Sequence, residues 1–147
     1  MLLCAIHLHH LLTAETISDV YESNATDDII VRVSVSFLPE QSEPDRGRWF
    51  WAYHIRIENE GLMAAQLLTR HWDIRDANGA HHMVDGEGVV GEQPVIKPGG
   101  AYDYVSGCPL TTPSGSMQGS YQMLGEDGSR FDIAIPKFAL TTPVTAG

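Results

Sequence analysis

Residues 29–37 read IIVRVSVSF, and residues 49–58 read WFWAYHIRIE. In both stretches an apolar side chain stands at every second position. A period of two places these side chains on one face of an extended chain, which is typical of a half-buried β-strand. β-Branched and aromatic residues, which favour strands, dominate both stretches. We therefore predict two long strands, separated by the loop 38–48, which contains prolines and a glycine.

Shorter strands are predicted downstream from the same alternation and from turn signals. They span residues 68–74, 80–84, 102–105, 119–124 and 130–136. Asn78-Gly79, between the first two, favours a tight hairpin because both residue types tolerate positive φ. A long polar loop is expected from Pro109 to Gly115. No stretch beyond residue 28 has sustained helical periodicity. The sequence therefore predicts an all-β fold, an antiparallel β-sandwich of seven or eight strands like fibronectin type III or immunoglobulin domains.

The chain is acidic and has the length of one domain. It contains 147 residues, with 9 Lys and Arg against 19 Asp and Glu, which gives a net charge of −10. Nucleic-acid phosphates and anionic membrane surfaces repel such a protein, so neither is an expected partner. Hydrophobic residues make up 43% of the chain and charged residues 19%, a balance that excludes a wholly disordered protein. No uninterrupted apolar run approaches the ~18 residues of a membrane-spanning helix.

Residues 1–12 read MLLCAIHLHHLL and superficially resemble a secretory signal. Histidines interrupt this apolar run and no basic residue precedes Arg32, so we do not expect secretion. The expected organisation is an N-terminal extension at residues 1–19, one domain at 20–143 and a tail at 144–147. The extension is expected to be flexible or to reflect a mis-assigned start codon.

The sequence contains no constellation typical of an enzyme. Cys4 and Cys108 lack the spacing of a disulfide framework or a zinc site, and a reducing cytoplasm fits them. Cys108 lies between a glycine and a proline with no base beside it, so a small buried thiol is expected. Ser114 and Ser116 stand in a turn-like run rather than in a G-x-S-x-G nucleophile elbow. We predict that the protein is not an enzyme.

Gly86, Gly88 and Gly91 satisfy the pattern G-x-G-x-x-G of phosphate-binding loops. In dinucleotide-binding folds this loop works because a helix begins there and directs its N–H groups at the phosphates. Here Pro94 and Pro98 follow and no helical pattern begins. A glycine-rich loop of the sandwich is therefore the favoured interpretation. Binding of an anion, nucleotide or pyrophosphate through this loop is the alternative.

Candidate metal ligands cluster just before and within the same loop: His81, His82, Asp85 and Glu87. The two histidines are adjacent in a predicted strand, so they point to opposite faces and at most one joins a given site. Co²⁺ accepts imidazole, whereas Mg²⁺ prefers oxygen ligands. We predict no resident cofactor, and weak binding of a divalent cation, cobalt or magnesium, is the hypothesis for these residues.

Several stretches, in this order, resemble the ApaG family. They are Phe37–Ser42, Trp51–Tyr53, Ile57–Asn59, Arg70–Trp72, Asp76–Gly79, Gly88–Pro94, Ser106–Leu110, Thr112–Gly115, Met117, Gly119–Tyr121, Phe131 and Ile135–Pro136. The resemblance covers the chain from Tyr21 to Pro143. It implies a fibronectin-III-like β-sandwich and an association with cobalt resistance and magnesium efflux.

The same resemblance implies a role in protein binding, because related domains of eukaryotic F-box and DNA-polymerase-interacting proteins look like protein-binding modules. Phe50 points away from the face that carries Trp49 and Trp51, so it is a candidate for a partner-facing surface. Arg70 and His71, within a family motif, complete that candidate surface. We expect a cytoplasmic, non-enzymatic binding module with an unidentified protein partner, linked only indirectly to metal traffic.

Overall fold

The structure, a computed structural model, describes residues 22–143. These residues form nine β-strands and two short 3₁₀ turns. The strands are β1 (Glu22–Thr26), β2 (Ile29–Phe37), β3 (Trp49–Asn59), β4 (Ala65–Asp76), β5 (His81–Glu87), β6 (Val95–Ile96), β7 (Ala101–Leu110), β8 (Gly115–Gly125) and β9 (Arg130–Leu140). The 3₁₀ turns η1 (Pro39–Gln41) and η2 (Pro44–Arg46) lie between β2 and β3. Within this part of the chain, no helix is long and apolar enough to cross a membrane.

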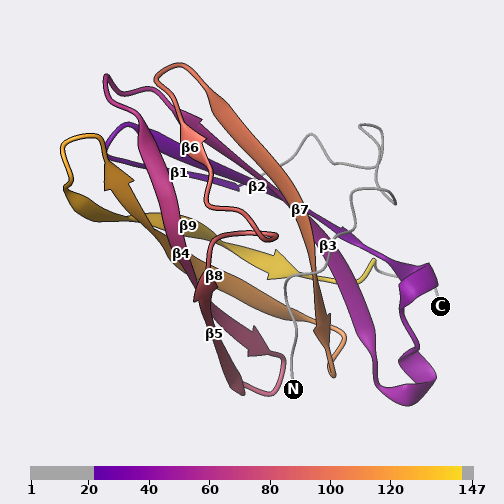
Figure 1. The fold of residues 1–147 in the computed structure, drawn as a ribbon. Helices are drawn as coiled ribbons and strands as arrows, with labels where there is room; N and C mark the ends of the chain where they lie inside the picture. The colour runs from indigo at the N-terminus through magenta and orange to yellow at the C-terminus, as the bar shows by residue number, and fades with distance from the viewer. Residues whose placement is uncertain (1–21, 144–147) are drawn as a thin grey trace.

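Two antiparallel sheets face each other (Figure 1). One has the strand order β1-β2-β3-β7, and the other has the order β5-β4-β8-β9 with β6 paired to β4. The strands of each sheet join as hairpins or cross between the sheets, so the fold is the predicted antiparallel sandwich.

The apolar faces predicted from the alternating sequence form the core between the sheets. Ile29, Val31 and Val33 of β2 are at most 2% exposed, and Trp51 and Tyr53 of β3 at most 1%. Trp72, Tyr121 and Met123 fill the core from the opposite sheet and are fully buried. The rings of Tyr53 and Trp72 meet edge to face with centroids 5.4 Å apart, which ties the two sheets together. Each large apolar side chain buried in this way contributes roughly 1.5–3 kcal/mol.

The structure corrects several predicted boundaries. Strand β1 was not predicted, because its sequence ESNAT has no apolar alternation and its residues are mostly exposed. The loop expected from Pro109 to Gly115 is short, since β7 continues through Leu110 and β8 begins at Gly115. Strand β5 extends past the predicted 80–84 to Glu87, so Gly86 and Glu87 belong to a strand. The predicted extension at 1–19 and tail at 144–147 lie outside the described residues.

Candidate functional site

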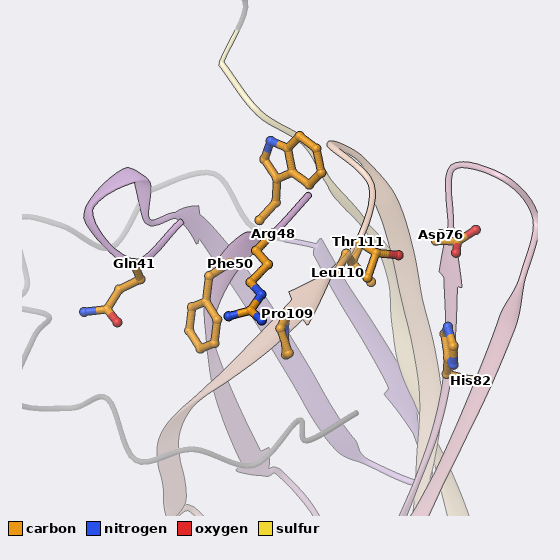
Figure 2. A pocket seen from close by; sticks show the side chains of 9 residues that line it. Gln41, Arg48, Phe50, Asp76, His82, Pro109, Leu110 and Thr111 are labelled. Carbon is orange, nitrogen blue, oxygen red and sulfur yellow. The ribbon is translucent and has the colours of Figure 1, made fainter. Parts of the chain in front are cut away.

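A pocket of about 470 Å³ opens at one end of the sandwich (Figure 2). It is surrounded by the first residues of β3, the last residues of β7 and the β4–β5 hairpin. Its lining consists of Gln41, Arg48, Trp49, Phe50, Asp76, His82, Pro109, Leu110 and Thr111. Figure 2 shows Asp76 and His82 on one wall, with Arg48 and Phe50 on the other. We call this cavity the end pocket.

The apolar floor of the end pocket comes from paired residues of β3 and β7. Trp49 stands opposite Leu110 in the register of the two strands, and Phe50 stands opposite Pro109. Both aromatic side chains are half-buried on opposite faces of β3: Trp49 packs against the core, and Phe50 packs against Leu38 and Ala52. The backbone N–H of Phe50 donates to the Ser42 hydroxyl (3.0 Å), which donates to the carbonyl that precedes η1 (2.8 Å). These bonds fix the floor to the loop that leads into β3.

Arg48 forms one wall, at the foot of a small hairpin. Its backbone N–H donates to the carbonyl of Glu43 (3.1 Å), and its carbonyl accepts from the N–H of Glu43 (2.8 Å). Gly47 reverses the chain between them with a φ of 68°, in the left-handed region that glycine adopts without strain. The backbone of Arg48 is therefore fixed. Its guanidinium forms no ion pair or side-chain hydrogen bond that involves a described residue.

Asp76 and His82 form the opposite wall, on the β4–β5 hairpin. One oxygen of the Asp76 carboxylate, Oδ1, accepts from the backbone N–H of Asn78 (2.9 Å) and of Ala80 (3.0 Å). The sequence predicted this hairpin from Asn78-Gly79, and the structure confirms it with a φ of 84° at Gly79. His82 faces the pocket from β5, while its neighbour His81 lies on the other face of the sheet, as the alternation predicted.

Thr112 links the two turns that border the end pocket. Its hydroxyl accepts from the backbone N–H of Ala77 (3.1 Å) in the β4–β5 turn. It donates to the carbonyl of Ser114 (2.7 Å) in the β7–β8 turn. The Thr112 side chain is only 7% exposed, and both hydrogen bonds are partly buried. These bonds tie the β4–β5 turn to the β7–β8 turn beside the end pocket.

The glycines of the predicted phosphate loop build a hairpin tip. Val90 and Gly91 both have positive φ, 43° and 83°, which is the requirement of a two-residue type I′ turn. The N–H groups of Val89 and Glu92 donate to each other's carbonyls, and Gly88 donates to Leu68 (2.8 Å). No helix begins here, in contrast to a dinucleotide-binding loop.

Arg70 lies against this hairpin, on the inner side of the loop. Its Nη1 donates to the carbonyls of Glu87 (3.0 Å) and Gly88 (2.9 Å). Gly86 leaves room for the guanidinium, because a Cβ there would lie 2.8 Å from Arg70 Cζ. These contacts hold the loop in place, and the assignment of Arg70 to a partner-facing surface stays a prediction.

Tyr104 and Tyr121 lie near Arg70, and the ring of Tyr102 lies beside that of Tyr104 with centroids 6.2 Å apart. The hydroxyls of Tyr104 and Tyr121 share a short hydrogen bond in the core. Burial raises the pKa of both hydroxyls well above its usual value. Burial and the hydrogen bond that Tyr102 donates to Glu92 (2.9 Å) raise the pKa of Tyr102 to about 12. These hydroxyls stay neutral at ordinary pH and form structural hydrogen bonds, one of the Tyr104–Tyr121 pair donating and the other accepting.

The candidate metal ligands separate in the structure. His81 contacts Asp73 (3.2 Å), and His71 contacts Asp85 (2.6 Å), both on the outer face of the second sheet. His82 lies in the end pocket instead. In residues 22–143, no three His, Cys, Asp or Glu side chains gather in a way that could hold a metal ion. His71, predicted as part of a partner-facing surface, is partly exposed on that outer face.

Comparison with known proteins settles the family. A family model described as the ApaG domain matches residues 39–125. The chain belongs to the ApaG family. The Protein ApaG of Afipia carboxidovorans is 58% identical over 118 residues, which cover 80% of this chain and 91% of that protein. The Protein ApaG of Rhodospirillum centenum is 53% identical over 121 residues, which cover 82% of this chain and 93% of that protein.

Solved structures that are similar to this chain have the same fold. The ApaA protein of Bordetella pertussis superposes with a TM-score of 0.78 at 44% identity, covering 80% of this chain and 96% of that one. A second crystal structure superposes with a TM-score of 0.76 at 46% identity, covering 80% of this chain and 89% of that one. The predicted resemblance and the predicted sandwich are therefore both confirmed.

Sequence reasoning identified one aromatic residue of the end pocket and missed the pocket itself. Phe50 was singled out because it lies out of phase with the buried face of β3. His82 was singled out as a metal ligand. Arg48 and Pro109 were not grouped with them, because the sequence does not show that the start of β3, the end of β7 and the β4–β5 hairpin meet at one end of the sandwich.

Proposed function

We propose that this ApaG-family protein is a non-enzymatic, cytoplasmic binding module that holds a segment of a partner protein in the end pocket. The preformed pocket of about 470 Å³ carries the proposal. Its volume lies in the range of ligand sites, and its apolar floor with a few polar groups at the rim is the composition of a recognition site. The paired backbone of Trp49 and Phe50 and the hydrogen bonds of Thr112 support it, because a preorganised site loses little entropy on binding.

The experiment uses a display library of random peptides selected on the intact protein. We expect enriched peptides that lose at least tenfold in affinity for Phe50→Ala and bind Phe131→Ala as they bind the unchanged protein. Phe131 is a matched control because it is a half-buried aromatic that packs on the core outside the end pocket. Equal binding of enriched peptides to both variants, or no enrichment above a blank surface, would refute the proposal. Thermal melts establish that both variants are folded.

We further propose that a link to cobalt resistance or magnesium efflux acts through the bound partner. The exposed histidines support this, since His71 and His81 are each engaged by a carboxylate. Calorimetry with Co²⁺ and Mg²⁺ is expected to show no site tighter than about 1 mM, or about −4 kcal/mol. A micromolar Co²⁺ site abolished by His81→Ala or His82→Ala would make the protein itself the metal binder.

A further inference from the structure

The end of the sandwich opposite the end pocket displays two apolar side chains to solvent. Strand β3 runs from the end pocket at Trp49 to this opposite end at Asn59 (Figure 1). In the β3–β4 turn that follows, Leu62 is 97% exposed and Met63 is 47% exposed. Both line a hollow of about 460 Å³ that residues of the β1–β2, β3–β4 and β8–β9 turns surround. Among residues 22–143, Leu62 is the most exposed large hydrophobic side chain.

Hydrogen bonds hold the backbone of the β3–β4 turn, so the exposure of Leu62 is built into the fold. Asn59, at the end of β3, is only 1% exposed. Its side-chain amide donates to the carbonyl of Met63 (2.9 Å), and its side-chain oxygen accepts from the N–H of Gly61 (2.9 Å). A buried asparagine thus fixes the chain on both sides of an exposed leucine. An apolar side chain displayed on a fixed backbone is a preorganised contact, which loses little entropy when a partner covers it.

Exposed carboxylates surround these two apolar side chains. They come from the same three turns and are Asp27, Asp28, Glu60, Glu126 and Asp127. The turns are joined, because the N–H of Glu60 donates to the carbonyl of Asp28 (2.8 Å) and Glu126 accepts from the N–H of Ala64 (2.7 Å). Arg130, which lines the hollow, and Lys97, in the β6–β7 turn, are outnumbered by these acids. We call the surface formed by Leu62, Met63 and the five carboxylates the acidic end.

The charge of the acidic end distinguishes between possible occupants. Its carboxylates repel nucleic acid and anionic lipid. A second copy of this chain brings a net charge of −10 of its own. Residues 1–21 and 144–147, which lie outside the described part of the chain, contain no Lys or Arg and therefore supply no complementary charge. The apolar side chains and the carboxylates together favour a partner protein that presents an apolar residue between basic ones.

We propose that the acidic end is a second binding surface, which takes an extended segment of a partner protein with an apolar residue flanked by lysines or arginines. The apolar residue packs on Leu62 and Met63 in the hollow, and the flanking bases pair with the carboxylates of the surrounding turns. Charge complementarity of this kind speeds association and fixes the register of the bound segment. The inference goes beyond the proposed function, because it concerns the opposite end of the sandwich.

A display library of random peptides, selected on the full chain with the Phe50→Ala substitution, tests the inference without a contribution from the end pocket. We expect enriched peptides in which Lys or Arg flanks an apolar residue, and fluorescence anisotropy of labelled copies measures their affinity. Leu62→Ser is expected to weaken these peptides at least about tenfold, and Met83→Ser to leave their affinity unchanged. Met83 is the matched control, because it is 58% exposed and lies on the outer face of the second sheet, outside the hollow.

Asparagine in place of Asp27 and Asp28 tests the carboxylates and keeps the turn. Both residues have positive φ, 50° and 67°, a region that asparagine also adopts. The double variant is expected to weaken the peptides about tenfold at low salt and much less at high salt, where exposed charges are screened. Glu40→Gln with Asp45→Asn is the matched control, because it removes two exposed carboxylates from the loop between β2 and β3. We expect this control to bind the peptides almost as tightly as the parent.

Several results would overturn the inference. Enriched peptides without Lys or Arg, or equal weakening by the two double variants, would show that the carboxylates of the acidic end select nothing. Equal binding to Leu62→Ser and Met83→Ser, or no enrichment, would show that no segment binds there. Binding to phosphatidylglycerol vesicles, or self-association in ultracentrifugation, that Leu62→Ser abolishes would assign the surface to lipid or to a second copy instead.

Failure of the inference is distinguishable from failure of the proposed function. The selection on Phe50→Ala reports on the acidic end, whereas the end pocket is tested by peptides whose binding depends on Phe50. Phe131 lines the hollow of the acidic end. A peptide that the unchanged protein binds there is therefore expected to respond to Phe131→Ala and not to Phe50→Ala.

Discussion

Replacing Thr112 with valine removes the hydroxyl that joins the two turns of the end pocket while keeping the shape of the side chain. The loss comprises the bond accepted from Ala77 (3.1 Å) and the bond donated to Ser114 (2.7 Å). A neutral hydrogen bond contributes about 1 kcal/mol net, so we expect the free energy of unfolding to fall by about 2 kcal/mol. In a domain of this size that corresponds to a drop of roughly 6–10 °C in Tm.

Urea denaturation at constant pH measures the effect of Thr112→Val, with an unchanged m-value as evidence that the unfolded state is the same. Thr111→Val is the matched control, because Thr111 is the exposed neighbour and the same substitution there removes no buried bond. We expect Thr111→Val to change the free energy of unfolding by at most about 0.5 kcal/mol. A Thr112→Val protein as stable as Thr111→Val would refute the argument that this hydroxyl holds the two turns together.

Three further outcomes are expected. Gly119→Ala is expected to lower the free energy of unfolding by several kcal/mol, because a Cβ there would lie 2.0 Å from a backbone oxygen of β4. Gly91 stands in open space, so Gly91→Ala is expected to lower it by only about 1 kcal/mol, from the positive φ alone. Equal losses in denaturation experiments would contradict this expectation. Because the pKa of Tyr102 is raised to about 12, its contribution to stability is complete below about pH 10 and is lost as pH rises through 12, which ultraviolet titration with parallel denaturation tests; ionisation near pH 10 would contradict it. Millimolar ATP or pyrophosphate leaves the NMR signals of the Gly88 and Val89 amides unshifted, because both N–H groups already donate within the protein; a saturable shift would revive the anion alternative.

The strands with strict alternation could be predicted from the sequence because burial on one face dictates the residue type at every second position. The core residues of β2 and β3 follow that rule without exception from Ile29 to Val33 and from Trp51 to Ile57. Strand β1 could not be predicted, because its residues are mostly exposed and burial therefore does not dictate their type. It is held by backbone pairing with β2, which leaves no pattern in side-chain types.

The end pocket could not be predicted for a different reason. Its walls come from hairpins that are distant in sequence, and only the register of β3 with β7 brings Trp49 to Leu110 and Phe50 to Pro109. The glycine pattern at 86–91 allowed both a sandwich loop, the favoured interpretation, and a phosphate loop, because a type I′ turn and a close approach to Arg70 require the same small residues as a phosphate loop. Residue type alone does not distinguish these two uses.

Backbone amide NMR shifts of the protein, mapped during titration with a peptide enriched on it, test directly whether the end pocket holds the partner segment. We expect shifts that saturate together at Trp49, Phe50, Leu110 and Thr111 and at the side-chain signals of Arg48, with the outer faces of both sheets unchanged. Shifts that centre on Gly86–Gly91 or on the outer face around His71, with the end pocket silent, would contradict it.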